Sequence, residues 1–98
     1  MKITTTNSGK VCTLTVEGRI DTLTAPEMEK EVMANIPVCD KMIFDLSGVD
    51  YISSAGLRML LSAQKTMNQQ GTMKVKNANE MILEIFEVTG FSDILTIE

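Results

Sequence analysis

Two adjacent serines, Ser53 and Ser54, are the residues whose type and position point most directly to chemistry. They stand at the start of a helical pattern that follows an apolar run, and sites in open α/β sheets are commonly built at such junctions. A serine there can cap the helix by accepting a hydrogen bond from a backbone N–H two or three residues further on. The same helix end favours an anion, so it would also accommodate a phosphate on Ser54. The residues therefore leave two interpretations open, a structural cap and a phosphorylation site.

Catalysis by these serines is not expected. The chain contains no histidine, which excludes a Ser-His-Asp or Cys-His hydrolase and removes a common metal ligand. A lysine that activates Ser54 would have to be Lys41, Lys65 or another distant residue. The segment also lacks the GxxxxGK[ST] pattern of a nucleotide-binding loop. We expect no enzymatic activity, no bound metal and no cofactor.

A second candidate segment, residues 18–26, has the sequence GRIDTLTAP. Its simplest interpretation is a turn glycine followed by a solvated ion pair and a helix cap. If the fold places this segment beside Ser54, Asp21 could accept a hydrogen bond from the serine hydroxyl and orient it for a kinase. The phosphoryl donor and its metal would have to come from that partner, because a carboxylate alone cannot transfer a phosphoryl group.

Gly56 and Met59 lie in the first turns of the same predicted helix. The absent side chain of Gly56 either lets another surface approach the backbone or allows tight packing beneath the helix. Most of the eight methionines fall within predicted elements, where we expect them to fill the core. Met59 is the expected exception, a partly exposed residue of an adaptable interface.

Strands are predicted in four places. Residues 10–16 alternate apolar and polar side chains, as a half-buried strand does, and the β-branched residues 3–6 precede them across an Asn-Ser-Gly turn. The apolar run 42–44 predicts a central strand covered on both faces, followed by a loop through Ser53. Residues 72–76 alternate as a further strand.

Helices are predicted between these strands, in residues 24–36, 54–70 and 77–89. Thr24 and Glu27 form a capping box for the first helix, and Asn77 is expected to cap the last. The order β-β-α-β-α-β-α, with a short C-terminal element, predicts an α/β fold in which a mixed sheet carries helices mainly on one face. The 98 residues fit one domain, residues 1–98.

Composition restricts the partners and the location. A net charge of -4 offers no broad cationic surface, so nucleic acid is not an expected partner. No segment has the length of a membrane span or the apolar core of a signal peptide, so we expect a cytoplasmic protein without membrane insertion. Cys12 and Cys39 form no CxxC pair, and we expect both to be buried free thiols.

Several motifs together resemble bacterial STAS domains of the anti-sigma factor antagonist type. They are GRIDTLTAP at residues 18–26, DLS at 45–47, YISSAGL at 51–57 and TGF at 89–91. The resemblance spans essentially the whole chain. It implies the STAS fold, a mixed sheet with helices packed mainly on one face.

The resemblance also implies a regulatory cycle. The unphosphorylated protein would bind an anti-sigma factor that is also a serine kinase, and sigma factor would be released. The kinase would use Mg-ATP to phosphorylate Ser54, which lies two residues before the Gly-Leu pair, and a PP2C-type phosphatase would reset the switch. Many members carry aspartate immediately before that serine, whereas this chain has Ser53, which is the second choice for modification.

The hypothesis assigns a partner-facing patch in which a leucine gives apolar contact beside the serine hydroxyl. Its members are Asp21, Thr22, Ser53, Ser54, Gly56, Leu57 and Arg58. The alternative function is that of a non-switching STAS adaptor subunit in an ABC-type lipid transport complex. Retention of a serine at position 54 argues against that alternative, because such adaptors often lack the modifiable residue.

Overall fold

Four strands and three main helices make up the chain in the computed structural model, which describes residues 1–98. In chain order they are β1 (Lys2–Ser8), β2 (Val11–Ile20), α1 (Ala25–Asn35), β3 (Lys41–Ile52), α2 (Ser54–Gln70), β4 (Thr72–Lys76) and α3 (Glu80–Thr89). Two short 3-10 turns, η1 (Ile36–Val38) and η2 (Phe91–Asp93), follow α1 and α3. The predicted order β-β-α-β-α-β-α is confirmed.

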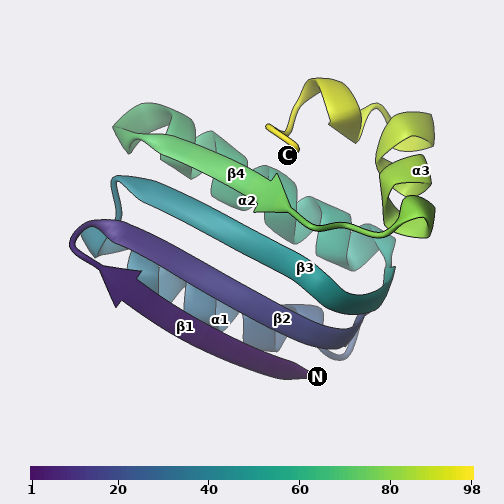
Figure 1. Cartoon of the computed structure of the whole chain (residues 1–98), viewed down its shortest axis with the longest axis horizontal. Coiled ribbons are helices and arrows are strands. Elements are labelled where there is room, and N and C mark those ends of the chain that lie inside the picture. Colours follow the sequence, from purple (N-terminus) through teal and green to yellow (C-terminus); the bar gives the residue numbers. More distant parts are fainter.

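The four strands form one mixed sheet in the order β1-β2-β3-β4. β1 pairs antiparallel with β2, and the other two pairs are parallel. α1 and α2 lie side by side behind the sheet, α3 lies beside one end of it, and the front face carries no helix (Figure 1). The predicted placement of the helices, mainly on one face, is confirmed. None of the helices combines the length and the apolarity that crossing a membrane requires.

The core lies between the sheet and the helices, and it explains one wrong prediction. Met42 and Phe44 of β3 are fully buried, whereas Ile43 between them is only half-buried. Both crossover helices cover the same face of the sheet, so alternate residues of β3 face the core and the rest face the open side. The run 42–44 is therefore a strand covered on one face rather than on two.

β3 is also longer than predicted, because it continues to Ile52 where a loop was expected. Leu46, Val49 and Ile52 are all buried, but they do not keep a strict period of two. The pairing of β2 with β3 shifts register between Thr15 and Glu17 and again between Gly18 and Arg19. These irregularities hide the alternation from the sequence, since a bulge moves the following side chains to the other face.

Two predicted caps are also corrected. Thr24 occupies the N-cap position of α1 but makes no side-chain capping bond. Asn79 rather than Asn77 caps α3, and its side-chain oxygen accepts a hydrogen bond from the backbone N–H of Ile82 at 2.9 Å. Asn77 instead donates a hydrogen bond from its amide to a carboxylate oxygen of Asp45.

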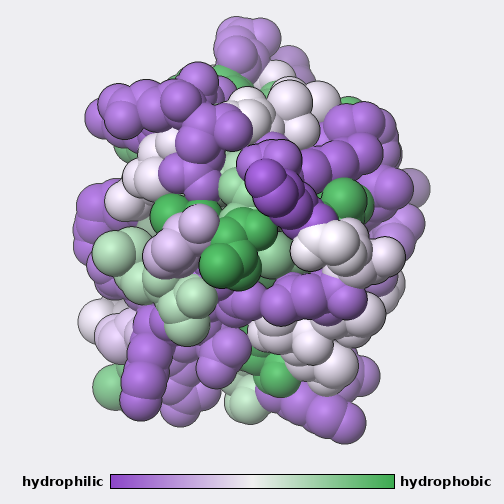
Figure 2. Space-filling model, turned by 90° about the vertical axis from the view of Figure 1, so that its left-hand side faces the viewer, coloured by the Kyte–Doolittle hydropathy of each residue, from purple (hydrophilic) through white to green (hydrophobic).

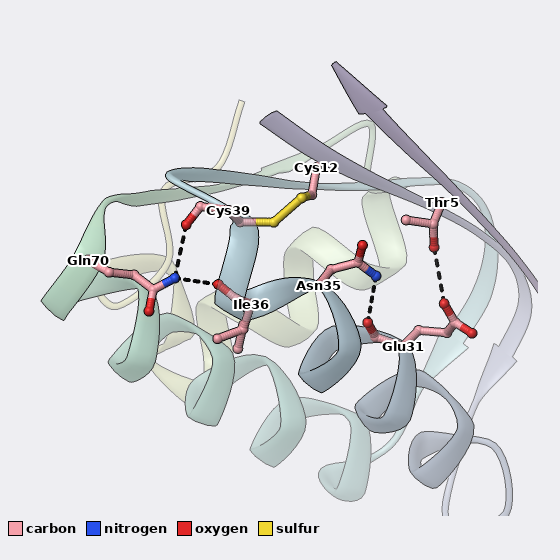
Figure 3. Close-up of a disulfide and its surroundings, with 7 residues drawn as sticks. All are labelled: Thr5, Cys12, Glu31, Asn35, Ile36, Cys39 and Gln70. Carbon is pink, nitrogen blue, oxygen red and sulfur yellow. Dashed lines mark hydrogen bonds between the residues drawn. A yellow bond between two sulfur atoms is a disulfide. The ribbon is translucent and has the colours of Figure 1, made fainter. Parts of the chain in front are cut away.

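The two cysteines form a disulfide, so the prediction of free thiols is wrong (Figure 3). Both residues are buried, as expected. The backbone N–H groups of Asp40 and Lys41 both donate to the carbonyl of Lys10, at 2.9 and 3.2 Å. This pairing brings the start of β2 against the end of η1 and leaves the Cα atoms of the cysteines 5.9 Å apart, within the range that a disulfide bridges.

Candidate functional site

The loops that leave the carboxyl ends of β2 and β3 lie side by side. β2 and β3 run parallel, with Ile20 paired to Ile52 at their ends. The backbone N–H of Ser53 donates to the carbonyl of Ile20 at 2.8 Å, which fixes the start of α2 against the β2–α1 loop. The structure therefore brings together the two segments that the sequence singled out.

The two serines have different environments. The Ser53 hydroxyl caps α2 by accepting a hydrogen bond from the backbone N–H of Gly56 at 3.4 Å, and Ser53 is half-buried. Ser54 is the first residue of α2, it is exposed, and its hydroxyl makes no hydrogen bond within the chain. The capping role thus belongs to Ser53, and Ser54 presents a free hydroxyl to the surface.

Asp21 organises its own loop instead of orienting Ser54. Its carboxylate accepts hydrogen bonds from the backbone N–H groups of Leu23 at 3.0 Å and Thr24 at 3.1 Å. The backbone N–H of Thr24 holds the pKa of Asp21 below its usual value, and the Leu23 N–H and Arg19 act in the same direction. The two segments lie side by side, but no hydrogen bond joins Asp21 to the Ser54 hydroxyl, and one oxygen of the carboxylate, Oδ1, accepts both of these backbone bonds.

Arg19 is held against the sheet beside this loop. Its guanidinium lies 4.6 Å from the ring centroid of Tyr51 on the neighbouring strand, a cation–π contact. Its Nε atom is 3.7 Å from a carboxylate oxygen of Asp21. The ion pair was expected from the sequence, but the contact with Tyr51 was not, because it depends on the register of β2 with β3, which local patterns do not reveal.

The exposed apolar residue at the site is Leu23 rather than Leu57. Leu57 is only 8% exposed and belongs to the core, so it cannot supply the apolar contact assigned to it. Leu23 is 85% exposed and lies in the loop that Asp21 organises. Its signal in the sequence was a leucine that lies outside both the predicted strand 10–16 and the predicted helix 24–36.

A groove of about 270 Å³ runs between α1 and α2 next to the serines. Of the predicted patch, Thr22 and Arg58 line it, together with Ala25, Pro26, Glu29, Ala55, Met59 and Ser62. Met59 is only 5% exposed, so its expected place in an exposed interface is corrected to the buried wall of this groove. No group of three or more acidic or cysteine side chains is arranged to hold a metal ion.

Figure 2 shows the end of the molecule opposite to the start of α2, toward which the β1–β2 turn points. Hydrophilic residues there surround a small hydrophobic area. The only hollow that lies beside the serines is the groove between α1 and α2, since the second groove of the structure is lined by Ile3, Glu27, Lys30 and Glu31. The candidate site is therefore confined to the end formed by the β2–α1 loop and the start of α2.

Gly56 packs tightly beneath α2, which decides between its two interpretations. A Cβ atom added at Gly56 would lie 2.7 Å from side-chain carbons of both Ile20 and Ile52. The glycine therefore allows α2 to approach the sheet, and its missing side chain faces the core instead of a partner.

We expect Gly56→Ala to lower the free energy of unfolding by about 1 to 3 kcal/mol, because the added methyl group overpacks a well-filled core. Urea denaturation measures the change. Ser62→Ala, an exposed substitution on the same helix, is the control and should change stability by less than about 0.5 kcal/mol. A Gly56→Ala variant as stable as the parent would show that Ile20 and Ile52 move aside without cost.

Comparison with known proteins places these features in a family context. The sequence matches the STAS domain family over residues 2–98. BtrV of Bordetella bronchiseptica, which is named as an anti-sigma factor antagonist, is 30% identical over 99% of this chain and 85% of its own length. The crystal structure of an anti-sigma factor antagonist from Mycobacterium paratuberculosis has a TM-score of 0.90 at 22% identity, covering 98% of this chain and 83% of that one. SpoIIAA of Bacillus, in its phosphorylated form, has a TM-score of 0.78 at 11% identity, covering 99% of this chain and 91% of that one.

Proposed function

Because the chain belongs to the STAS domain family, we propose that it acts as an anti-sigma factor antagonist, which binds an anti-sigma factor and so releases a sigma factor. The single observation that carries the proposal is the free, exposed hydroxyl of Ser54 at the start of α2, beside the loop that presents Leu23. The name of BtrV, a relative at 30% identity, supports the same function.

We further propose that phosphorylation of Ser54 switches binding off. The anti-sigma factor would itself be the serine kinase and would supply Mg-ATP, and a PP2C-type phosphatase would remove the phosphate. This chain would supply the acceptor hydroxyl, and the kinase would supply the nucleotide, the metal ion and the groups that hold them. SpoIIAA, which shares the fold, exists in a phosphorylated form, and this supports the assignment of a switch.

The partner surface is proposed to combine Asp21, Thr22, Leu23, Ser54 and Arg58. Leu23 would supply apolar contact, and Asp21 holds the loop that carries it. A phosphate on Ser54 adds about -1.5 to -2 charges at pH 7. Docking would then require desolvation of that charge, so affinity falls without a change of fold. A cytoplasmic location is proposed because sigma factor acts there.

The test is phosphorylation by the cognate anti-sigma factor kinase with Mg-ATP, followed by phosphopeptide mapping. We expect the parent protein and Ser53→Ala to incorporate phosphate and Ser54→Ala to incorporate none. Ser62→Ala, which removes a hydroxyl on the same helix that lines the groove, is the matched control and should be labelled like the parent.

Label that persists in Ser54→Ala and disappears in Ser53→Ala would move the modification to the capping serine. Phosphorylated protein that binds the anti-sigma factor as tightly as the unmodified form would overturn the proposed switch. Stable copurification with a transport ATPase that is unaffected by Ser54→Asp would instead indicate the adaptor role.

A further inference from the structure

Arg58 is a cation without a partner at the edge of the candidate site. Its side chain is exposed and lines the groove between α1 and α2. None of the ion pairs in the structure includes it. The other arginine of the chain, Arg19, is engaged by Tyr51 and Asp21. Arg58 therefore makes no ion pair in the unmodified chain and is available to an added anion.

The position of Arg58 on α2 places it next to the hydroxyl of Ser54. Arg58 follows Ser54 by one helical turn, and residues four apart in a helix lie on the same face with their Cβ atoms about 5 to 6 Å apart. Side chains of a helix also tilt toward its N-terminus, which carries the guanidinium of Arg58 in the direction of Ser54. A phosphate on Ser54 would thus stand within reach of the Arg58 N–H groups.

Resting on the proposed phosphorylation of Ser54, we propose that Arg58 is the counter-ion of the phosphorylated serine. The guanidinium binds phosphate oxygens in the geometry that makes arginine the preferred partner of phosphate groups. Pairing with the phosphate also removes the free guanidinium from the rim of the groove. Phosphorylation then changes the partner surface in two ways: it adds the phosphate to Ser54, and it engages the Arg58 guanidinium in an ion pair.

The other charged group that lines the groove is Glu29 on α1. Asp21 and Arg19 form an ion pair in the adjoining segment, which also contributes Thr22 to the groove. The acidic groups raise the second pKa of a neighbouring phosphate, and the arginines lower it. All of these other groups stay in place when Arg58 is substituted. A comparison of Arg58 variants therefore isolates the contribution of this one side chain.

The test uses full-length protein with phosphoserine incorporated at position 54 during translation, so it requires no kinase. Phosphorus NMR follows the titration of the phosphate between pH 4 and 9. We expect the second pKa of the phosphate to be higher in Arg58→Gln than in the parent by about 0.3 to 0.7 units, the size of an exposed ion pair. Arg58→Lys, which keeps the charge but loses the planar fork, should fall between them.

Lys65→Gln is the matched control, since it removes the same charge from an exposed position farther along α2. Its titration should coincide with that of the parent within about 0.1 units, because solvent screens charges beyond about 8 to 10 Å. An Arg58→Gln shift no larger than that of Lys65→Gln would overturn the assignment of Arg58.

Failure of the proposed function would give a different result. The phosphate would titrate as expected in the Arg58 variants, but phosphoserine at position 54 would not change the affinity for the anti-sigma factor. That outcome would support the pairing of Arg58 with the phosphate and overturn the proposed switch.

Discussion

The double substitution Cys12→Ala and Cys39→Ala, which removes the disulfide, is expected to lower the free energy of unfolding by about 3 to 4 kcal/mol. The two residues are 27 positions apart, so the bond closes a long loop and restricts the unfolded chain. Both side chains are also buried, and their replacement loses apolar contacts in the core. Urea denaturation of the oxidised parent and the double variant measures the difference.

Reducing the parent protein with a dithiol distinguishes two contributions to stability, that of the disulfide bond and that of the buried side-chain volume. The reductant should lower the denaturation midpoint of the parent and leave that of the double variant unchanged, since only the parent has a bond to reduce. Equal midpoints for the parent with and without reductant would show that the bond does not form or adds no stability in solution.

The reduced protein should still fold, because several other contacts hold the same corner. The side-chain amide of Gln70 donates to the carbonyls of Ile36 and Cys39, at 2.6 and 2.9 Å (Figure 3). The backbone N–H of Thr72 donates to the carbonyl of Asp40 at 2.9 Å. This corner lies at the opposite end of the sheet from Ser54, so a reducing cytoplasm would lower stability without rearranging the candidate site.

Much of the fold was predictable because local patterns determine it. The alternation over residues 10–16 and the helical spacing over residues 54–70 identify β2 and α2, and the latter range matches the observed helix. The end of α2 at Gly71 and the start of β4 at Thr72 were equally clear. These elements are regular, so neighbouring residues carry enough information to define them.

The remaining features depend on contacts between distant segments. The extension of β3 to Ile52 requires its irregular pairing with β2, and the disulfide requires the β2–η1 corner. At the site, the sequence singled out Ser54 and the Asp21 loop. Helical spacing already placed Leu57 on the apolar face of α2 with Leu60 and Met67, and all three are buried, so its assignment to the partner surface conflicted with that pattern. Leu23 is the exposed apolar residue instead, in a loop whose conformation depends on the hydrogen bonds from the Leu23 and Thr24 N–H groups to Asp21.

Replacing Gly71 with alanine is expected to lower the free energy of unfolding by about 3 kcal/mol, which is similar to the effect of removing the disulfide. A Cβ atom at Gly71 would lie 1.8 Å from the carbonyl oxygen of Asp40 and 2.7 Å from its carbonyl carbon. These are backbone atoms of the corner next to the disulfide, and the same oxygen accepts the hydrogen bond from Thr72. Relief of the overlap must therefore move α2 or β3.

The matched control for this variant is Gly90→Ala, because alanine is unfavourable at the two positions for different reasons. Gly71 has a φ of 172°, which is extended backbone open to any residue, so its cost comes from the overlap with Asp40 alone. Gly90 has a φ of 80° and nothing within 4 Å of an added Cβ, so its cost is the left-handed conformation, about 1 to 2 kcal/mol. Urea denaturation should therefore rank Gly71→Ala as less stable than Gly90→Ala. The reverse order would mean that the corner around Asp40 yields more easily than the backbone conformation at Gly90.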